Sequence, residues 1–354
     1  MAVVQRLQVP FDHELVVARP GPRCGYRFII AIHSSLDTDP PGRAAGGCRL
    51  ARYEDPLAGL HDALRLSQAM SRKAAIAGTR TGGGKCVIAA PAEESPWPLV
   101  GDRREAVLRD LAEVVGGLDG RYMTGPDVGT TAADMEWVHT LTPYAGGFAG
   151  GGTADGTAVG VYACLTAAAR HVFGSSDLRG RRITIVGLGG VGEPLARLLA
   201  ESGAQLRVTD IDPSRQGLAA ELGALWVAPE AAQRSDCEIL VPCALGGTLT
   251  ADEVGAMTCR LVVGAANNQL ASDEVAELMH RRGIAWVPDF VANAGGLLYA
   301  VSVRRDQLSV RDGLALVRRL GDTADEVLRR AELEQTTTLA AAIQIADERL
   351  QTAP

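Results

Sequence analysis

A glycine-rich turn between two apolar segments constrains the fold of this chain more than any other feature. Residues 182–186 (RITIV) have the branched apolar side chains of a buried strand. They lead into Gly187-Leu188-Gly189-Gly190-Val191-Gly192, after which a helical pattern and a second strand, Gln205 to Thr209, follow. Strand and helix patterns then alternate as far as residue 287. This alternation predicts a parallel, doubly wound α/β sheet.

The same turn has a chemical meaning in this setting. Its glycines allow a tight turn and a close approach of the backbone to a pyrophosphate, which the N-terminus of the following helix would bind. Asp210 ends the second strand at the position expected of an acid that hydrogen-bonds a ribose. A carboxylate there repels a 2′-phosphate, so the pattern favours NAD over NADP. Arg215, just past the acid, keeps some use of NADP open.

The chain contains only two lysines, Lys73 and Lys85, and arginine supplies every other basic side chain apart from histidine. Arginine stays charged, whereas lysine is a compact point charge that can lose its proton. Lys85 follows three glycines, and close packing beside a second cation would favour its neutral amine. We therefore predict that Lys85 transfers protons. Asp127, in a turn after a short strand, is the candidate counter-charge, although an aspartate that only caps a turn would give the same pattern.

Two further segments point to recognition of a small molecule. From Pro56 the apolar residues recur with helical spacing, and Met70 and Lys73 lie one turn apart on this helix. An apolar side chain and a cation would thus project together, as a carboxylate with an apolar tail requires. The extended segment 44–53 contains Gly46 and Gly47, and glycines within a strand usually mark close approach by a ligand or another backbone.

Composition excludes several classes of function. The net charge is −7, only 4% of residues are aromatic and the arginines are dispersed among acids, so nothing indicates nucleic-acid binding. We find no signal peptide and no apolar run long enough for a membrane span. The seven cysteines form no C-x-x-C pair, so no metal site is predicted, and their dispersal fits reduced thiols in the cytoplasm.

Eight sequence blocks occur in the order G-G-C-R, M-S-R-K, G-G-G-K, T-G-P-D-V-G-T, G-L-G-G-V-G, P-C-A-L-G-G, G-A-A-N-N and P-D-F-V-A-N-A-G-G. With these blocks, residues 25–350 resemble the glutamate/leucine/phenylalanine/valine dehydrogenase superfamily, closest in motif to the phenylalanine and leucine enzymes. The resemblance implies an α/β fold with three parts. They are a mixed-sheet substrate and oligomerisation domain (1–147), a Rossmann-type NAD domain (148–330), and a C-terminal helix that packs back on the first domain (331–354). A glycine-rich segment, 148–153, would link the two domains.

The implied reaction is the reversible, NAD-dependent oxidative deamination of an L-amino acid to its 2-oxo acid and ammonia, in a homo-oligomer of at least two chains. By this likeness Lys73 binds the substrate carboxylate, Lys85 is the catalytic acid and base, and Asp127 assists proton transfer at the amino group. The other implied substrate contacts are Ala45, Gly46, Met70, Asn268, Asn293, Leu297 and Ala300. The implied cofactor contacts are Thr157, Gly187, Leu188, Gly189, Gly190, Val191, Gly192, Asp210, Ile211, Cys243, Ala244, Ala266 and Asn268.

The resemblance also bears on substrate choice. Met70 is apolar, which disfavours a dicarboxylate, and Ala45 together with Gly125-Pro126-Asp127 resembles the phenylalanine-type enzymes. A phenylalanine-like substrate is therefore expected ahead of leucine or valine. Arg72 departs from the tyrosine or apolar residue of the relatives and would alter substrate choice or lower activity. The alternatives are a biosynthetic relative that makes an oxo acid or imine for natural-product coupling, and a non-catalytic NAD-binding paralogue.

Overall fold

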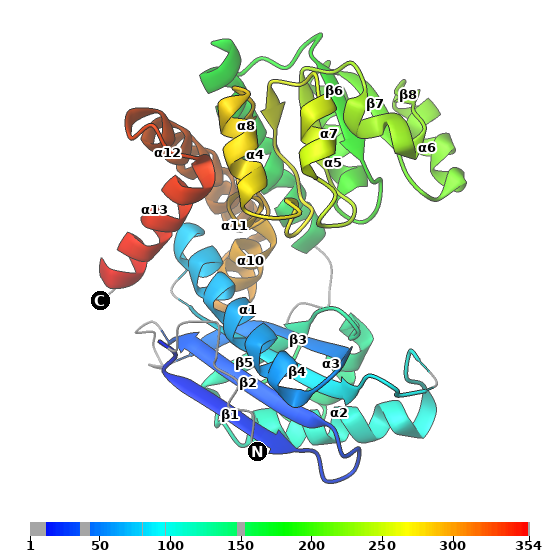
Figure 1. The fold of residues 1–354 in the computed structure, drawn as a ribbon, viewed down its shortest axis with the longest axis vertical. Coiled ribbons are helices and arrows are strands. Elements are labelled where there is room, and N and C mark those ends of the chain that lie inside the picture. Colours follow the sequence, from blue (N-terminus) through cyan, green and yellow to red (C-terminus); the bar gives the residue numbers. More distant parts are fainter. Residues whose placement is uncertain (1–11, 36–42, 80, 96, 147–152, 353–354) are drawn as a thin grey trace, which may run out of the picture. The chain divides into compact units, whose positions relative to one another are not determined.

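The chain forms two compact units. The computed structural model describes residues 12–35, 43–79, 81–95, 97–146 and 153–352. By internal contacts the first unit comprises Met1–Gly150 with Arg349–Pro354, and the second comprises Gly151–Glu348 (Figure 1). The predicted domain boundary at 147/148 and all of the predicted linker except Thr153 lie outside the described residues.

A five-stranded mixed sheet is the centre of the first unit. Its strands are β1 (Leu15–Pro20), β2 (Arg27–Ser34), β3 (Ala44–Tyr53), β4 (Gly82–Pro91) and β5 (Tyr122–Pro126). They lie in the order β1-β2-β4-β3-β5. β2 is antiparallel to both of its neighbours, whereas β4, β3 and β5 run parallel. The parallel part therefore places the end of β5 beside the interior of β3, and the site is built there.

Helices cover both faces of this sheet. α1 (Pro56–Ile76) begins at Asp55, whose carboxylate accepts the Ala58 N–H, and its Ala63 and Leu64 pack on strand residues of one face. α2 (Gly101–Gly116) and α3 (Ala132–His139) contribute to the larger apolar core on the other face. The fold follows from the alternation of buried side chains along the strands, which gives the sheet two apolar faces.

One predicted boundary is wrong. The sequence after the helix break at Gly78 predicts a loop over residues 79–84 and a strand over residues 86–90, because glycine disfavours strands. In the structure, however, Gly82–Gly84 are the first three residues of β4. A Cβ at Gly82 would lie 1.9 Å from the carbonyl oxygen of Ser34, and one at Gly83 would lie 2.0 Å from the backbone nitrogen of Ser71. Glycines are rare in strands, but here only glycine allows the strand to lie this close to its neighbours.

The second unit contains a six-stranded parallel sheet. Its strands are β6 (Arg182–Val186), β7 (Gln205–Thr209), β8 (Leu225–Trp226), β9 (Ile239–Pro242), β10 (Leu261–Val262) and β11 (Ala285–Trp286). Their order is β11-β10-β9-β6-β7-β8, and every pairing is parallel. The chain thus winds outward in both directions from β6, which is the doubly wound Rossmann arrangement. These observations confirm the predicted fold class.

The helices of the second unit pack on this sheet and on one another (Figure 1). They are α4 (Thr153–Phe173), α5 (Gly192–Glu201), α6 (Gln216–Glu221), α7 (Ala251–Ala256), α8 (Glu274–Arg281), α9 (Asp289–Ala292), α10 (Gly295–Tyr299), α11 (Val310–Arg318), α12 (Leu320–Leu333) and α13 (Thr338–Thr352). The end of α13 belongs to the first unit, where the Arg349 guanidinium donates to the carbonyl oxygen of Ile76 at 2.8 Å. None of the helices in the described ranges combines the length and apolar character of a membrane span.

Candidate active site

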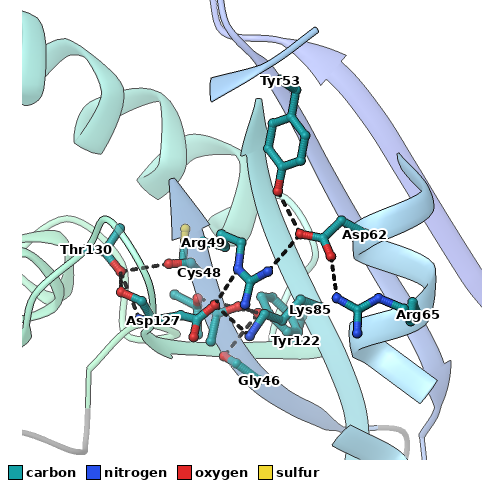
Figure 2. A network of polar contacts seen from close by, with 12 residues as sticks. Gly46, Cys48, Arg49, Tyr53, Asp62, Arg65, Lys85, Tyr122, Asp127 and Thr130 are labelled. Atoms are coloured by element: carbon teal, nitrogen blue, oxygen red, sulfur yellow. Dashed lines mark hydrogen bonds and ion pairs between the residues drawn. The ribbon is translucent and has the colours of Figure 1, made fainter. Parts of the chain in front are cut away.

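Lys85 and Asp127 form an ion pair in the first unit. Nζ of Lys85 lies 2.9 Å from Oδ2 of Asp127, and the two side chains are only 9% and 23% exposed. Lys85 points from β4, and Asp127 follows the last residue of β5. The two strands are separated in the sheet by β3, so the pair forms across that strand (Figure 2). The structure thus brings together the two residues that we predicted to share proton transfer.

The glycines of β3 make room for this pair. A Cβ at Gly47 would lie 2.8 Å from Cβ of Asp127 and 3.3 Å from Nζ of Lys85. A Cβ at Gly46 would lie 1.7 Å from the carbonyl oxygen of Gly84 on β4. The Tyr122 hydroxyl donates to the carbonyl oxygens of Gly46 at 3.0 Å and of Gly47 at 3.1 Å. The two glycines therefore permit the close approach that their place in a strand predicted.

A short turn fixes the backbone of Asp127. The Asp127 N–H donates to Oγ1 of Thr130 at 3.0 Å, and that hydroxyl donates to the carbonyl oxygen of Cys48 on β3 at 2.7 Å. Gly129 has a φ of +79°, and a Cβ there would lie 1.9 Å from the carbonyl oxygen of Leu50. This left-handed residue lets the turn lie against β3, so the carboxylate is held on the sheet that carries Lys85.

Two cations keep Asp127 ionised. Burial alone would raise the pKa of this carboxyl group, but Lys85 and the guanidinium of Arg49 outweigh burial and hold the pKa below its usual value. Arg49 Nε lies 3.1 Å from the same Oδ2 that Lys85 contacts. At neutral pH the carboxylate is therefore an acceptor of hydrogen bonds from positively charged groups.

The other predicted substrate contacts of the first unit lie on α1 and β3. Met70, Arg72 and Lys73 are half-buried in the last two turns of α1. Ala45 is 7% exposed and pairs with Gly83 of β4, two residues before Lys85. A small side chain thus stands one residue before the Gly46–Gly47 pair.

In the second unit, the glycine turn has the form that a pyrophosphate requires. Gly187 follows β6 with a φ of +101°, and a Cβ at Gly192 would lie 2.0 Å from the Gly187 carbonyl oxygen. A Cβ at Gly189 or Gly190 would meet nothing within 4 Å. The turn is therefore tight at its ends and open in its middle, where it enters the N-terminus of α5.

Asp210 is held at the end of β7 beside this turn. Its Oδ2 accepts the Leu188 N–H at 2.7 Å, and its Oδ1 accepts the Asp212 N–H at 2.9 Å. Arg215 contacts Glu193 of α5, with Nη1 3.0 Å from Oε2. The open glycine turn, the helix N-terminus and the carboxylate together fit a dinucleotide.

Several other predicted cofactor contacts lie around the same sheet end. The Cys243 N–H donates to the Val186 carbonyl oxygen at 2.8 Å, and the Ala266 N–H donates to that of Pro242 at 3.0 Å. A Cβ at Gly187 would lie 2.9 Å from Cβ of Ala244. Ile211, next to Asp210, is 89% exposed. Thr157 lies elsewhere, on α4, where a Cβ at Gly296 would be 2.5 Å from its hydroxyl oxygen.

The predicted asparagines follow β10 and β11. Asn268 has a φ of +50°, and its N–H donates to Oδ2 of Asp289 at 2.8 Å. Asn293 is 5% exposed, and its Nδ2 donates to Oδ1 of Asn267 at 2.9 Å. Within the described residues, Oδ1 of Asn293 has no hydrogen-bond partner. A buried acceptor of this kind calls for a donor from a water molecule or a ligand.

The two predicted apolar contacts of the second unit are mostly buried. Leu297 of α10 is half-buried and Ala300 is buried.

The sequence did not reveal four polar residues around the ion pair. Arg49 stood in the G-G-C-R block without an assigned role, and Tyr53, Asp62 and Tyr122 carried no signal. Their partners lie on other strands or on α1 (Figure 2), so their roles depend on the lateral order of the strands. The place of Arg49 two residues after a pair of strand glycines is the one hint that the sequence offers.

Comparisons with known proteins identify the family. A sequence model of the "Glu/Leu/Phe/Val dehydrogenase, dimerisation domain" matches residues 24–144, and one of the "Glutamate/Leucine/Phenylalanine/Valine dehydrogenase" matches residues 216–351. The chain is 36% identical to the leucine dehydrogenase of Bacillus subtilis, over 96% of this chain and 92% of that protein. It is 35% identical to the phenylalanine dehydrogenase of Thermoactinomyces intermedius, with coverages of 96% and 92%.

A solved structure gives the same result. The crystal structure of the L-tryptophan dehydrogenase from Nostoc punctiforme superposes with a TM-score of 0.82, at 33% sequence identity over 97% of this chain and 96% of that one. The matches extend over both units and confirm the resemblance drawn from the eight sequence blocks. The chain belongs to the glutamate/leucine/phenylalanine/valine dehydrogenase family of amino-acid dehydrogenases.

Proposed function

We propose that this enzyme catalyses the reversible oxidative deamination of a hydrophobic L-amino acid to its 2-oxo acid and ammonia, with NAD as the oxidant. The observation that carries the proposal is the nearly buried Lys85–Asp127 ion pair, at 2.9 Å, in a glycine-lined part of the first sheet. A lysine that can release its proton, next to a carboxylate that stays ionised, suits repeated proton transfer at one carbon and one nitrogen.

Each residue then has a distinct task. Lys73 anchors the substrate carboxylate, and Asp127 accepts a hydrogen bond from the substrate amino group. The bound dinucleotide supplies the two-electron oxidant for the carbon–nitrogen bond. The amine of Lys85 takes a proton from the water that attacks the imine carbon, and later returns a proton to the departing nitrogen. As ammonia leaves, the hydroxyl gives its proton to the Lys85 amine, and the carbonyl of the 2-oxo acid forms.

The dinucleotide assignment rests on the second unit. The open glycine turn and the N-terminus of α5 would hold the pyrophosphate, and Asp210 would accept a hydrogen bond from a ribose hydroxyl. Arg215 is paired with Glu193, which supports NAD rather than NADP because a 2′-phosphate would have to compete for that guanidinium. The exposed Asn268 and the unmet acceptor of Asn293 are proposed to contact substrate and nicotinamide.

The substrate class follows from two apolar positions. Met70 lies one helical turn from Lys73, so the side chain next to the carboxylate anchor is apolar. Ala45 leaves more space than a larger side chain would, which favours an aromatic substrate over leucine or valine. The relatives act on leucine, phenylalanine and tryptophan, as their names state, and so support a hydrophobic substrate. The match of residues 24–144 to a dimerisation domain supports a homo-oligomer built through the first unit.

The decisive experiment measures NADH formation at alkaline pH with a panel of L-amino acids. We expect turnover of phenylalanine ahead of leucine and valine, and none of glutamate. A control with D-phenylalanine reports reactions that do not use this site. Tight NAD binding without turnover of any amino acid would instead identify a non-catalytic paralogue. Turnover confined to one unusual amino acid would favour the biosynthetic alternative.

Cofactor choice gives a second test. Asp210→Asn keeps the acceptor for the Leu188 N–H but removes the charge. We expect KM for NAD to rise about tenfold or more, as for loss of a charged hydrogen bond, and the preference over NADP to fall. Asp212→Asn is the matched control, because Asp212 is a neighbouring carboxylate that caps a short turn through the Ser214 N–H. An unchanged NAD/NADP ratio in Asp210→Asn would refute the role of Asp210.

A further inference from the structure

We propose that Arg49 is a positioning residue for the Lys85–Asp127 pair, and that Asp62 on α1 holds Arg49 in place. The inference rests on the proposed function, because it gives Arg49 a task within that proton transfer. It adds to the site two residues of the first unit, one on β3 and one on α1.

The guanidinium of Arg49 forms ion pairs with two carboxylates, and one of these also pairs with Lys85 (Figure 2). Nε of Arg49 lies 3.1 Å from Oδ2 of Asp127, and its Nη1 lies 2.9 Å from Oδ2 of Asp62. Lys85 contacts the same Asp127 oxygen at 2.9 Å. Arg49 therefore bridges a carboxylate of the candidate active site and a carboxylate of the helix that carries Lys73.

Asp62 is itself firmly held. Its Oδ2 also accepts the Tyr53 hydroxyl at 2.7 Å, and its Oδ1 accepts a guanidinium N–H of Arg65 at 2.8 Å. The Arg49 and Asp62 side chains are only 19% and 14% exposed. Burial would raise the pKa of Asp62, but Tyr53, Arg49 and Arg65 hold it below its usual value. Both carboxylates are thus ionised, and Arg49 lies between them.

Arg49 supplies a permanent positive charge to Asp127, which the proposed proton transfer by Lys85 requires. When Lys85 becomes a neutral amine, Asp127 loses one of its two cations while it remains mostly buried. An uncompensated buried carboxylate is costly, and it would recapture the proton or turn away. Arg49 cannot deprotonate under these conditions, so it keeps Asp127 charged and in place throughout the cycle. The neighbouring thiol of Cys48 adds no competing charge, because burial raises its pKa well above the usual value.

The shape of arginine also matters here. Its planar guanidinium presents Nε and Nη1 in different directions at fixed spacing, so it can bind two carboxylates at once. A lysine at position 49 would supply one point charge and could not bridge both groups. The two neighbouring cations would thus need opposite properties. The group at position 85 must be able to lose its proton, and the group at position 49 must keep it.

The experiment compares Arg49→Ala, Asp62→Asn and the wild-type enzyme. We expect Arg49→Ala to lower kcat about 100-fold, as for a misplaced catalytic group, with KM for the amino acid changed only severalfold. Guanidinium ion added to Arg49→Ala should restore part of kcat. Asp62→Asn should lower kcat in the same direction but less. Arg23→Ala is the matched control, because Arg23 also bridges two carboxylates of the first unit, Asp110 and Glu113, away from this site.

A second readout does not depend on turnover. Carbon-13 NMR can follow the titration of the Asp127 carboxyl group, identified by its absence in Asp127→Asn. The pKa of Asp127 should be higher in Arg49→Ala than in the wild type and unchanged in Arg23→Ala. Equal titrations in wild type and Arg49→Ala would overturn the inference, as would a kcat loss that guanidinium does not restore. If the wild type turns over no amino acid, the proposed function fails while the titration still decides the role of Arg49.

Discussion

Lys85→Arg is expected to lose nearly all turnover, by roughly 10³- to 10⁴-fold in kcat, which is the upper range for removal of a general acid and base. The variant keeps a cation beside Asp127, so the ion pair and the fold should persist. Arginine cannot release its proton near neutral pH, and the proposed water activation therefore stops. The measurement is steady-state NADH formation with saturating amino acid, together with dinucleotide binding by fluorescence.

Lys73→Arg provides the contrast within the same sequence block. The proposed task of Lys73 is to bind a carboxylate, which a guanidinium can also do. We expect KM for the amino acid to rise while kcat falls far less than in Lys85→Arg. If Lys73→Arg loses more kcat than Lys85→Arg, the two roles are exchanged. Substantial activity of Lys85→Arg would contradict proton transfer by Lys85.

Gly46→Ala should prevent normal folding of the first unit. The added Cβ would lie 1.7 Å from the Gly84 carbonyl oxygen, and that oxygen belongs to the backbone of a central strand that cannot move aside. We expect a loss of roughly 3 kcal/mol or more in the free energy of unfolding, at or above the usual cost of overpacking a core. Denaturant unfolding followed by circular dichroism measures this loss.

The control for this substitution lies in the same unit. Gly116 is the last residue of α2, and a Cβ there would lie 3.5 Å from Oγ1 of Thr142, an ordinary contact. Because alanine is favoured over glycine in helices by up to about 1 kcal/mol, Gly116→Ala should leave stability unchanged or raise it slightly. Equal stability of Gly46→Ala and Gly116→Ala would show that β3 and β4 can separate at this point.

Much of the fold could be predicted because local patterns determine it. The bounds of β3, β6 and β7 agree with the expected strands. The clearest case is β6, a run of apolar and β-branched residues that ends at the glycine turn. β4 could not be placed correctly, because three glycines have no intrinsic preference for a strand and adopt one only beside Ser34, Ser71 and Tyr122. Tertiary packing decides such cases.

The candidate site divides in the same way. Lys85 could be selected because lysine is rare in this chain and this one follows three glycines. Asp127 could be selected because it lies in a turn after a strand and in one of the family blocks. Arg49 and Asp62 could not, since arginine and aspartate are common in this chain and their bond joins a strand to a helix. Tyr122 was missed for a related reason. Its partners are the carbonyl oxygens of Gly46 and Gly47, and because every residue has a backbone carbonyl, residue types do not identify these acceptors.

The return of the chain to its first unit has a consequence for protein engineering. Residues up to 150 and residues from 349 onward belong to one unit, so the second unit is an insertion with two junctions rather than a C-terminal half. A chimera that exchanges the dinucleotide unit between relatives must therefore be cut at both 150/151 and 348/349. A single cut would deprive the recipient of Arg349, whose guanidinium donates to the carbonyl oxygen of Ile76 where the lysine-bearing helix ends.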